Sequence, residues 1–281
     1  MLVTALKDQY HVIGLTRQAA ANRNELKVDI ARKEQTMEPI LKVAPVVVVH
    51  AAAETSVDRC ETQRGLAEEV NVTGTANVAE SCAKIGAKLI FISTDYVFDG
   101  VKGNYVETDQ PNPVNFYGLT KLRAEHVVAT TLSNSLIVRT SVLYGWHPTK
   151  LNFATWILKE LREQQPVKLA IDHVNSPTFA DNLAGAVRMA IERDSGGILH
   201  IAGTERISRF DFAVRIAKTF RLEQSRLVPV KMQDLDWIAR RPRDSSLSVE
   251  KAERELGIEL YGVHRGLEEM LKSRPAAVPP T

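Results

Sequence analysis

Tyr117 and Lys121 stand four residues apart in the segment Tyr117-Gly-Leu-Thr-Lys121. Residues at this spacing share one face of a helix, which would bring the phenol and the ammonium together. A neighbouring cation favours phenolate and lowers the pKa of a tyrosine, which suits Tyr117 to proton donation near neutral pH. The same spacing arises by chance in surface pairs, so it indicates chemistry only together with other residues.

Two hydroxyls and a carboxylate close the apolar run at 88–93, in the order Ser93, Thr94, Asp95. Parallel sheets present ligand-binding groups at the carboxyl ends of their strands. Thr94 could therefore hydrogen-bond the substrate oxygen that Tyr117 protonates. The alternative is a turn capped by Asp95, and this segment alone supports both interpretations equally.

Short apolar runs alternate with helical patterns over the first half of the chain. The runs are continuous rather than alternating, as in strands buried on both faces, and lie at 12–15, 46–49, 88–93 and 136–139. Helical patterns separate them at 33–43, 61–85 and 117–130. This order predicts an α/β fold with a Rossmann-like, doubly wound parallel sheet.

The second half has a looser rhythm. Helices are predicted at 153–164, 180–193, 210–220 and 249–256, with a short strand at 198–201. We expect residues 1–145 to form a dinucleotide-binding region. Residues 146–281 would mainly bind substrate at the carboxyl edge of the sheet, with some return to it.

The composition excludes several classes of protein. The 281 residues carry a net charge of only +2, without the basic excess of a nucleic-acid or membrane-surface binder. The longest apolar run, at 43–53, contains Pro45 and is too short to span a bilayer. Cys60 and Cys82 cannot build a disulfide framework, which favours a reducing, cytoplasmic setting. The histidines show no metal-ligand spacing.

Several motifs together resemble the extended short-chain dehydrogenase/reductases and, within them, the dTDP-4-dehydrorhamnose reductase family. They cover most of the chain and are Ser-Thr-Asp-Tyr-Val-Phe-Asp-Gly at 93–100, Tyr117-Gly-x-x-Lys121, Arg-Thr-Ser-Val-Leu-Tyr-Gly at 139–145, Ser-Pro-Thr-Phe-Ala-Asp-Asn-Leu-Ala at 176–184 and Arg-Pro-Arg-Asp-Ser-Ser-Leu at 241–247. As a set they are far more specific than any one of them.

The resemblance implies an NADP-dependent sugar-nucleotide reductase. Tyr117 would protonate the C4 carbonyl oxygen of a nucleotide-linked 4-keto-6-deoxysugar. Lys121 would lower the pKa of Tyr117 and hold the nicotinamide ribose, while Thr94 and Asp95 would orient the sugar. NADPH, with NADH as the alternative, would supply the hydride. A homodimer is compatible with the resemblance.

Two residue pairs match cofactor-binding positions of the family. Thr16 and Arg17 end the second expected strand, where an arginine accommodates the 2′-phosphate of NADP; the alternative is an exposed strand-end arginine. Asp29 and Ile30 follow a weak strand at 26–28 and match an adenine-contacting pair, although Asp29 could simply cap the next helix.

Small residues follow the strand at 46–49 and match the positions that line the cofactor in the family: Ala51, Ala52 and Ala53. Bulky side chains there would block close approach of a dinucleotide, but small residues also suit packing at the start of a helix.

The beginning of a Rossmann fold is not found in the sequence. Such a fold opens with a strand, a glycine-rich turn and a helix that holds the pyrophosphate. Here the first glycine, Gly14, already lies in the second expected strand. We therefore expect the first strand and its turn to be lacking, because Met1 is an internal methionine, because the chain is naturally short, or because another segment fills the gap. The first explanation is favoured.

Other positions depart from the resemblance. Val142 stands where the reductases carry a sugar-contacting tryptophan, for which Trp146 is a candidate replacement, and His50 stands where asparagine is common. The basic cluster at 240–243 could meet a pyrophosphate or form a solvated turn.

Two alternative functions stay open. A non-catalytic, NADP-binding regulatory subunit, resembling the β subunit of methionine adenosyltransferase, has the same fold. An epimerase or dehydratase of the same superfamily is less favoured, because dehydratases commonly need a glutamate beside the threonine and Asp95 takes that place.

Overall fold

The computed structural model describes residues 1–17 and 24–275. Its centre is a four-stranded, all-parallel sheet with the strand order β10-β5-β4-β3. The strands are β3 (Val47–His50), β4 (Lys88–Thr94), β5 (Ser135–Thr140) and β10 (Gly197–His200). The α/β class with a parallel sheet, predicted from the sequence, is therefore confirmed.

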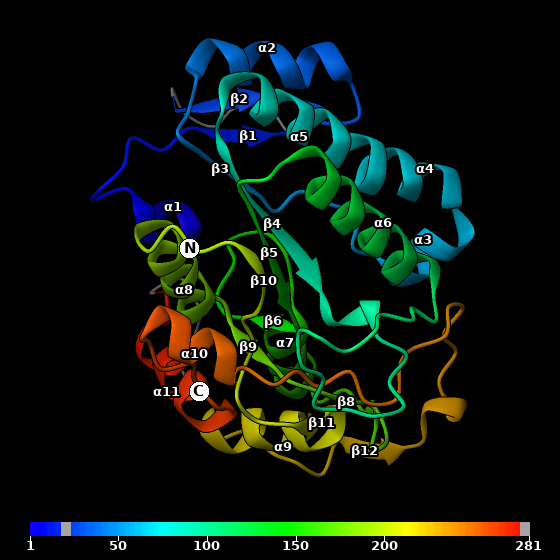
Figure 1. Cartoon of the computed structure of the whole chain (residues 1–281). Coiled ribbons are helices and arrows are strands. Elements are labelled where there is room, and N and C mark those ends of the chain that lie inside the picture. Colours follow the sequence, from blue (N-terminus) through cyan, green and yellow to red (C-terminus); the bar gives the residue numbers. More distant parts are fainter. Residues whose placement is uncertain (18–23, 276–281) are drawn as a thin grey trace.

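Helices cover both faces of this sheet (Figure 1). On one face Leu89 and Phe91 of β4 pack against α2 (Lys33–Val43), α5 (Gly74–Ile85) and α6 (Phe116–Thr131). On the other face Ile90 packs against α8 (Ala180–Glu192) and α10 (Glu250–Leu256). Side chains along β4 thus alternate between two covered faces. Because both faces are buried against helices, the run at 88–93 shows no polar face.

The helix predicted at 61–85 is interrupted. It is replaced by α3 (Val57–Thr62), α4 (Arg64–Glu68), a π-helical turn (Glu69–Thr73) and α5. The turn holds the buried Asn71, whose side chain bonds the backbone of Glu54 through both its oxygen and its nitrogen and also donates to Thr120 Oγ1 at 3.0 Å. The prediction of one helix was wrong because these long-range hydrogen bonds compete with the regular helical pattern.

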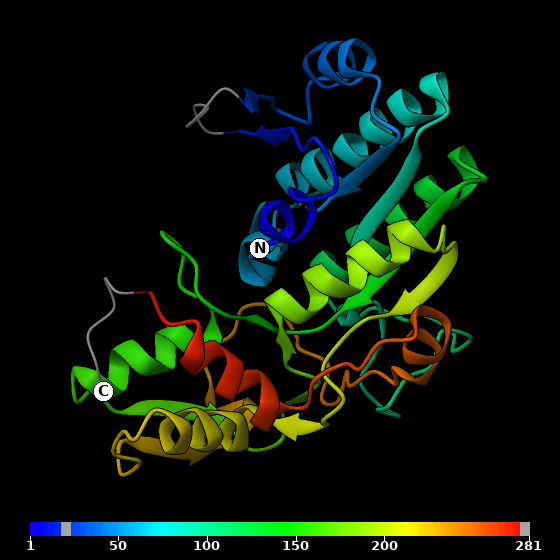
Figure 2. The ribbon, with the colours of Figure 1, turned by 90° about the vertical axis from the view of Figure 1, so that its left-hand side faces the viewer.

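Two further strands lie apart from the central sheet. β1 (Gly14–Thr16) and β2 (Glu25–Lys27) pair in parallel with each other, with Leu15 opposite Leu26. Within the described ranges β3 pairs only with β4 and is an edge strand. Figure 2 shows the β1–β2 ribbon separated from the sheet, while α1 (Leu2–Leu6) packs against α8.

A second core lies beneath the carboxyl edge of the sheet, in the lower half of Figure 1. Its helices are α7 (Phe153–Arg162), α9 (Arg209–Thr219) and α11 (Val263–Lys272). Short paired strands surround them: β6 (Leu143–Tyr144) with β9 (Thr178–Phe179), β7 (Val167–Ala170) with β12 (Leu227–Val230), and β8 (Val174–Asn175) with β11 (Ile207–Ser208). Two 3₁₀ turns complete the fold, at Asp95–Val97 and Met232–Asp234.

Candidate active site

Thr94 and Tyr117 meet at the carboxyl end of β4. Thr94 is the last residue of that strand, and Tyr117 lies in the first turn of α6, which begins where the side chain of Asn115 accepts a hydrogen bond from Gly118 N. Thr94 lies close enough to the Tyr117 hydroxyl to lower the pKa of the phenol. Thr94 Oγ1 also accepts from the backbone N–H of Tyr96 at 3.2 Å. The structure thus brings together two residues that the sequence singled out separately.

Lys121 lies one turn further along α6 and is buried. Its Nζ donates to the carbonyl oxygen of Ile92 at 2.7 Å and lies 4.0 Å from the centre of the Phe91 ring. Burial lowers the pKa of Lys121 to about 7.

Tyr117 is partly buried. The loss of water around its phenol raises its pKa above the ordinary value, and the nearby Thr94 opposes this rise. The expected lowering of the Tyr117 pKa by Lys121 is therefore not found. Desolvation of the phenolate outweighs the attraction of the neighbouring cation, so at neutral pH the phenol keeps the proton that a donor must hold.

Asp95 is held by three hydroxyls. Thr94 Oγ1 donates to its Oδ1 at 3.1 Å, while Ser141 Oγ and Ser245 Oγ donate to its Oδ2 at 2.9 and 2.5 Å. The carboxyl is 3% exposed, and burial raises its pKa. Sequence reasoning missed both serines as site residues, because their positions carry no local spacing signal.

Aromatic side chains continue outward from Tyr117. The Tyr96 ring meets it edge-on, with centroids 6.1 Å apart, and Tyr96 Oη lies 3.3 Å from Nε2 of His173. The Trp237 ring packs edge-on against His173 at 5.3 Å. His173 is 2% exposed, and its buried Nδ1 has no hydrogen-bond partner. His173 is therefore a core histidine that lies beside the site.

Two arginines flank this aromatic group. Arg209, at the start of α9, lies close enough to Tyr96 and Asp95 for its positive charge to oppose the rise in pKa of both. Arg241 Nη2 forms an ion pair with Asp58 at 3.0 Å, and its guanidinium lies 5.3 Å from the Trp237 ring centre. The basic cluster at 240–243 is therefore packed only in part: Arg241 lies beside the site, while Arg240 and Arg243 are exposed.

The cluster is also tied to the helix that carries Tyr117. Asn115 Nδ2 donates to the carbonyl oxygen of Arg240 at 2.9 Å, and Asn115 is the residue that caps α6. Polar contacts therefore connect the residues at 239–241 both to α6 and, through Asp58, to α3.

The cofactor-side candidates lie at other strand ends. Ala51, Ala52 and Ala53 follow β3, and the first two are exposed, so this strand end is open to a ligand. Thr16 ends β1, and Arg17 beside it is exposed. These positions leave room for a dinucleotide at the carboxyl ends of β1 and β3.

Asp29 and Ile30 have local partners. Asp29 Oδ1 accepts from Ala31 N at 3.1 Å, so it caps its own turn. Asn77 Nδ2 donates to the carbonyl oxygen of Ile30 at 2.8 Å, and the Ile30 side chain packs toward Gly74. The described residues offer room for a cofactor beside Ala51 and the buried Lys121. They offer no glycine-rich turn to bind its diphosphate, because the sequence contains no G-x-x-G-x-x-G.

Trp146 does not replace the sugar-contacting tryptophan. Its Nε1 donates to the carbonyl oxygen of Met270 at 2.6 Å, and its ring packs edge-on against Phe220 in the second core. Val142 is half-buried and supplies no aromatic surface. The aromatic side chain on this side of the site is Trp237, which the sequence did not single out.

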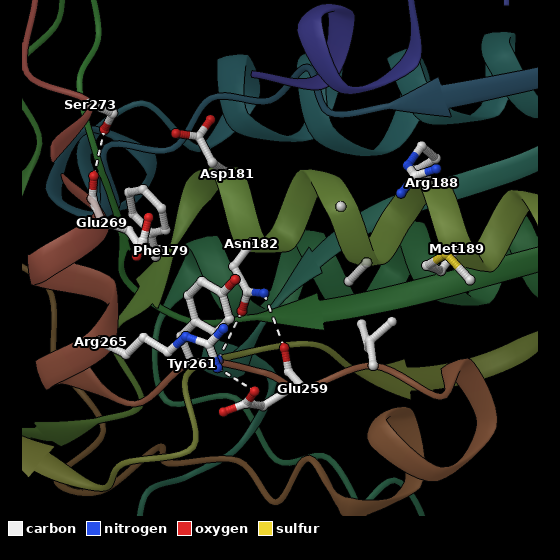
Figure 3. A pocket seen from close by; sticks show the side chains of 13 residues that line it. Phe179, Asp181, Asn182, Arg188, Met189, Glu259, Tyr261, Arg265, Glu269 and Ser273 are labelled. Carbon is white, nitrogen blue, oxygen red and sulfur yellow. Dashed lines mark hydrogen bonds and ion pairs between the residues drawn. The ribbon is translucent and has the colours of Figure 1, made fainter. Parts of the chain in front are cut away.

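A separate groove lies between α8 and α11 (Figure 3). Its charged and polar side chains bond one another: Arg265 pairs with Glu259 and covers the Tyr261 ring, and Asn182 holds the backbone of Glu259 and Tyr261. Neither Thr94, Tyr117 nor Lys121 lines it. These internal pairs leave no convergent polar groups for a ligand, so we place the active site at the strand ends instead.

Metal and membrane features are not found in the part of the chain that the structure describes. No group of three or more histidine, cysteine, aspartate or glutamate side chains there could hold a metal ion. Over residues 1–17 and 24–275, none of the helices has the length and apolar character needed to cross a bilayer.

Comparison with known proteins places these residues in context. Residues 1–275 match the protein family described as RmlD substrate binding domain. The chain is 31% identical over 258 residues to dTDP-4-dehydrorhamnose reductase of Escherichia coli (strain K12), covering 86% of this chain and 84% of the relative. It is 32% identical over 259 residues to methionine adenosyltransferase 2 subunit beta of Rattus norvegicus, covering 90% and 77% respectively.

Solved structures agree with the fold. The crystal structure of dTDP-4-dehydrorhamnose reductase from Bacillus anthracis, in complex with NADP, superposes with a TM-score of 0.86 at 28% identity, over 97% of this chain and 95% of that one. A hypothetical dTDP-4-dehydrorhamnose reductase from Sulfolobus tokodaii superposes with a TM-score of 0.84 at 35% identity, over 92% and 91%. The Rossmann-like architecture predicted from the sequence is thereby confirmed.

Proposed function

The chain belongs to the RmlD substrate binding domain family of NADP-dependent oxidoreductases, and from this membership we propose its reaction. It reduces the C4 ketone of a nucleotide-linked 4-keto-6-deoxysugar with NADPH, and Tyr117 donates the proton. The observation that carries the proposal is that Thr94 lies beside the Tyr117 hydroxyl, with the buried Lys121 one turn further along α6, at the carboxyl end of β4.

The proton transfer follows from the state of Tyr117. Because burial raises its pKa, the phenol is neutral at neutral pH and can give its proton to the carbonyl oxygen as that oxygen gains negative charge. The ammonium of Lys121, one turn away, would stabilise the phenolate left behind. Asp95 accepts the hydrogen of the Thr94 hydroxyl at 3.1 Å and so holds Thr94 in place beside the phenol.

NADPH, when bound, supplies the hydride. Lys121 would hold the nicotinamide ribose, and the exposed Arg17 offers a cation for the 2′-phosphate. Ala51, Ala52 and Ala53 leave the adjoining strand end open. Asp29 and Ile30 would face the adenine. The B. anthracis reductase that superposes on the chain holds NADP, which supports this choice of cofactor.

The substrate side offers cations and aromatic rings. Arg209 and Arg241 could bind the diphosphate of a nucleotide sugar, since arginine forks match phosphate oxygens. Trp237 offers a flat apolar face beside them. This combination supports a nucleotide-linked sugar over a free sugar, because a free sugar has no phosphate groups for these guanidinium groups to bind.

Oxidation of NADPH, followed at the nicotinamide absorbance band with a dTDP-4-keto-6-deoxysugar, tests the proposal. We expect turnover by the chain and a loss of about 10²–10⁴-fold in kcat for Tyr117→Phe, the usual worth of a general acid. Tyr261→Phe, in the separate groove, is the matched control and should keep full activity. A Tyr117→Phe variant that turns over at the unaltered rate would overturn the assignment.

A second candidate is a non-catalytic regulatory subunit that binds NADP. It is favoured by the 32% identity to methionine adenosyltransferase 2 subunit beta over 90% of this chain. In that case NADPH should bind without being oxidised in the presence of the keto sugar. The chain should then also change the activity of a purified methionine adenosyltransferase catalytic subunit, which a reductase would leave unaltered.

A further inference from the structure

A buried ion pair joins β5 to the two elements that carry the candidate catalytic residues, β4 and α6. Arg139 of β5 binds Glu125 of α6 through two nitrogens, with Nη2 to Oε2 at 2.7 Å and Nε to Oε1 at 3.0 Å. Ser93 Oγ of β4 donates to the same carboxylate at 2.5 Å. The side chains of Glu125 and Arg139 are 5% and 3% exposed. One carboxylate thus connects β4, β5 and α6.

The network lies directly behind the reacting groups. Ser93 precedes Thr94, and Glu125 follows Lys121 by four residues on α6, which places the two side chains on one face of the helix. The carbonyl oxygen that accepts from Lys121 belongs to Ile92, the residue before Ser93. The ion pair is therefore connected to Lys121 at two points: through α6, which carries the Lys121 backbone, and through β4, whose Ile92 carbonyl accepts from Lys121 Nζ.

The pair is not required by the fold class. A buried ion pair loses so much solvation that apolar side chains of similar size often stabilise a protein as well or better. The hydrogen bonding of the pair is also incomplete, since the buried Nη1 of Arg139 has no hydrogen-bond partner. Its guanidinium instead lies 5.1 Å from the centre of the Phe98 ring. A purely structural contact would gain little from this arrangement.

Few other charges act on Lys121. Glu125 is the carboxylate whose charge favours its protonated form. His50 of β3 also faces Lys121, and burial lowers the pKa of His50 to about 3, so this histidine is neutral at neutral pH. From α6, Lys121 is faced by Tyr117, which is also neutral. Arg139 of β5 binds the same Glu125 carboxylate, so its positive charge offsets part of the negative charge that Glu125 presents to Lys121.

We propose that Glu125 and Arg139 are positioning residues of the active site, which fix the end of β4 against α6 and balance the electrostatic field at Lys121. The inference rests on the proposed function, because it assumes that the charge of Lys121 assists Tyr117. It goes beyond that function by giving a role to two residues that contact neither substrate nor cofactor.

The charge balance predicts shifts of opposite sign. Glu125→Gln keeps the shape but leaves the Arg139 cation uncompensated, which disfavours protonated Lys121 and lowers its pKa below about 7. Arg139→Gln leaves the Glu125 carboxylate uncompensated, which favours protonated Lys121 and raises the pKa of Lys121. We expect each shift to be about one pH unit, the lower end for a neighbouring charge. The double variant should return Lys121 close to its original titration.

The test is an NMR titration of isotope-labelled lysine side chains in the full chain, with the Lys121 signal assigned from Lys121→Arg. It needs no turnover, so it separates failure of this inference from failure of the proposed reaction. Shifts of opposite sign in the two single variants, with recovery in the double, support the inference. Shifts of the same sign, or none, in folded variants would overturn it, since mere loosening of structure has no charge-dependent sign.

A single variant of a buried pair can fail to fold, because it strands an unpaired charge. The exchanged pair Glu125→Arg with Arg139→Glu keeps two opposite charges in contact and provides a second measurement. It brings a cation next to Lys121 on the same face of α6, so the pKa of Lys121 should fall. An unaltered Lys121 titration in the exchanged pair would equally refute the charge-balancing role.

Discussion

Gly118 provides a sharp steric test of the site, because it stands beside Tyr117 where α6 crosses the turn after β4. A methyl group at Gly118 would overlap the carbonyl oxygen of Tyr96 and lie 3.0 Å from both the carbonyl carbon of Tyr96 and Cβ of Pro113. The tightest overlap is the one with the carbonyl oxygen of Tyr96. Carbon and oxygen atoms in weak contact lie about 3.3–3.6 Å apart, so α6 would have to retreat by about 1–1.5 Å. The obstacle is backbone, which cannot rotate away as a side chain can.

The retreat would move Tyr117 away from Thr94. A misplacement of about 1 Å can cost about 10²-fold in rate, and overpacking usually costs about 1–3 kcal/mol of stability. Helix propensity favours alanine over glycine by about 1 kcal/mol and partly offsets this loss. We therefore expect Gly118→Ala to fold, with a modestly lowered free energy of unfolding and a loss of about 10²-fold in kcat.

Gly185→Ala is the matched control. Gly185 also lies within a helix, α8, but a methyl group there meets no atom within 4 Å. It should therefore stabilise the protein by up to about 1 kcal/mol and leave NADPH oxidation unaltered. Urea unfolding and steady-state kinetics on both variants give the comparison. A Gly118→Ala variant with unaltered kcat and stability would show that the contact between α6 and the Tyr96 turn does not position Tyr117.

Two further predictions concern acid stability and the residues that bind substrate. Burial lowers the pKa of both His50 and His200 from 6.5 to about 3. Between these pH values only the unfolded chain binds a proton at each histidine. The free energy of unfolding should therefore fall as the pH drops from 6.5 toward 3, by about 1.4 kcal/mol per pH unit for each histidine. Urea unfolding of His200→Gln across this range should give a shallower fall, and an equal slope would contradict the assignment. Asp58→Ala removes the partner of Arg241 and of the Ala239 amide, and should raise KM for the nucleotide sugar about 10-fold, the worth of about 1.4 kcal/mol, with little loss in kcat; a fall in kcat with unaltered KM would refute a substrate-side role.

The sequence by itself determined the parallel sheet and the two residues at its chemical centre. The runs at 88–93 and 136–139 became β4 and β5, because a strand buried on both faces must be apolar throughout. The spacing of Tyr117 and Lys121 placed both on α6, since four residues make about one helical turn. Both signals come from neighbouring residues in the sequence, so they do not depend on how distant parts of the chain pack.

Tertiary structure decided which distant groups complete the site. Asp95 binds Ser141 and Ser245, which lie 46 and 150 residues away in sequence. Likewise the imidazole of His173 reaches Tyr96 across 77 residues. No periodicity marks such positions, because contacts between separate elements bring them together: Ser141, for example, directly follows β5, whose Thr140 pairs with Thr94 of β4.

Burial decided the electrostatics in the same way. The Tyr117–Lys121 spacing predicted a lowered pKa for Tyr117, whereas burial raises that pKa and brings the pKa of Lys121 down to about 7. Spacing along a helix specifies which charges are neighbours, but not how much water remains around them. Desolvation depends on every element packed over the site, so the proton-holding state of Tyr117 could be read only from the folded chain.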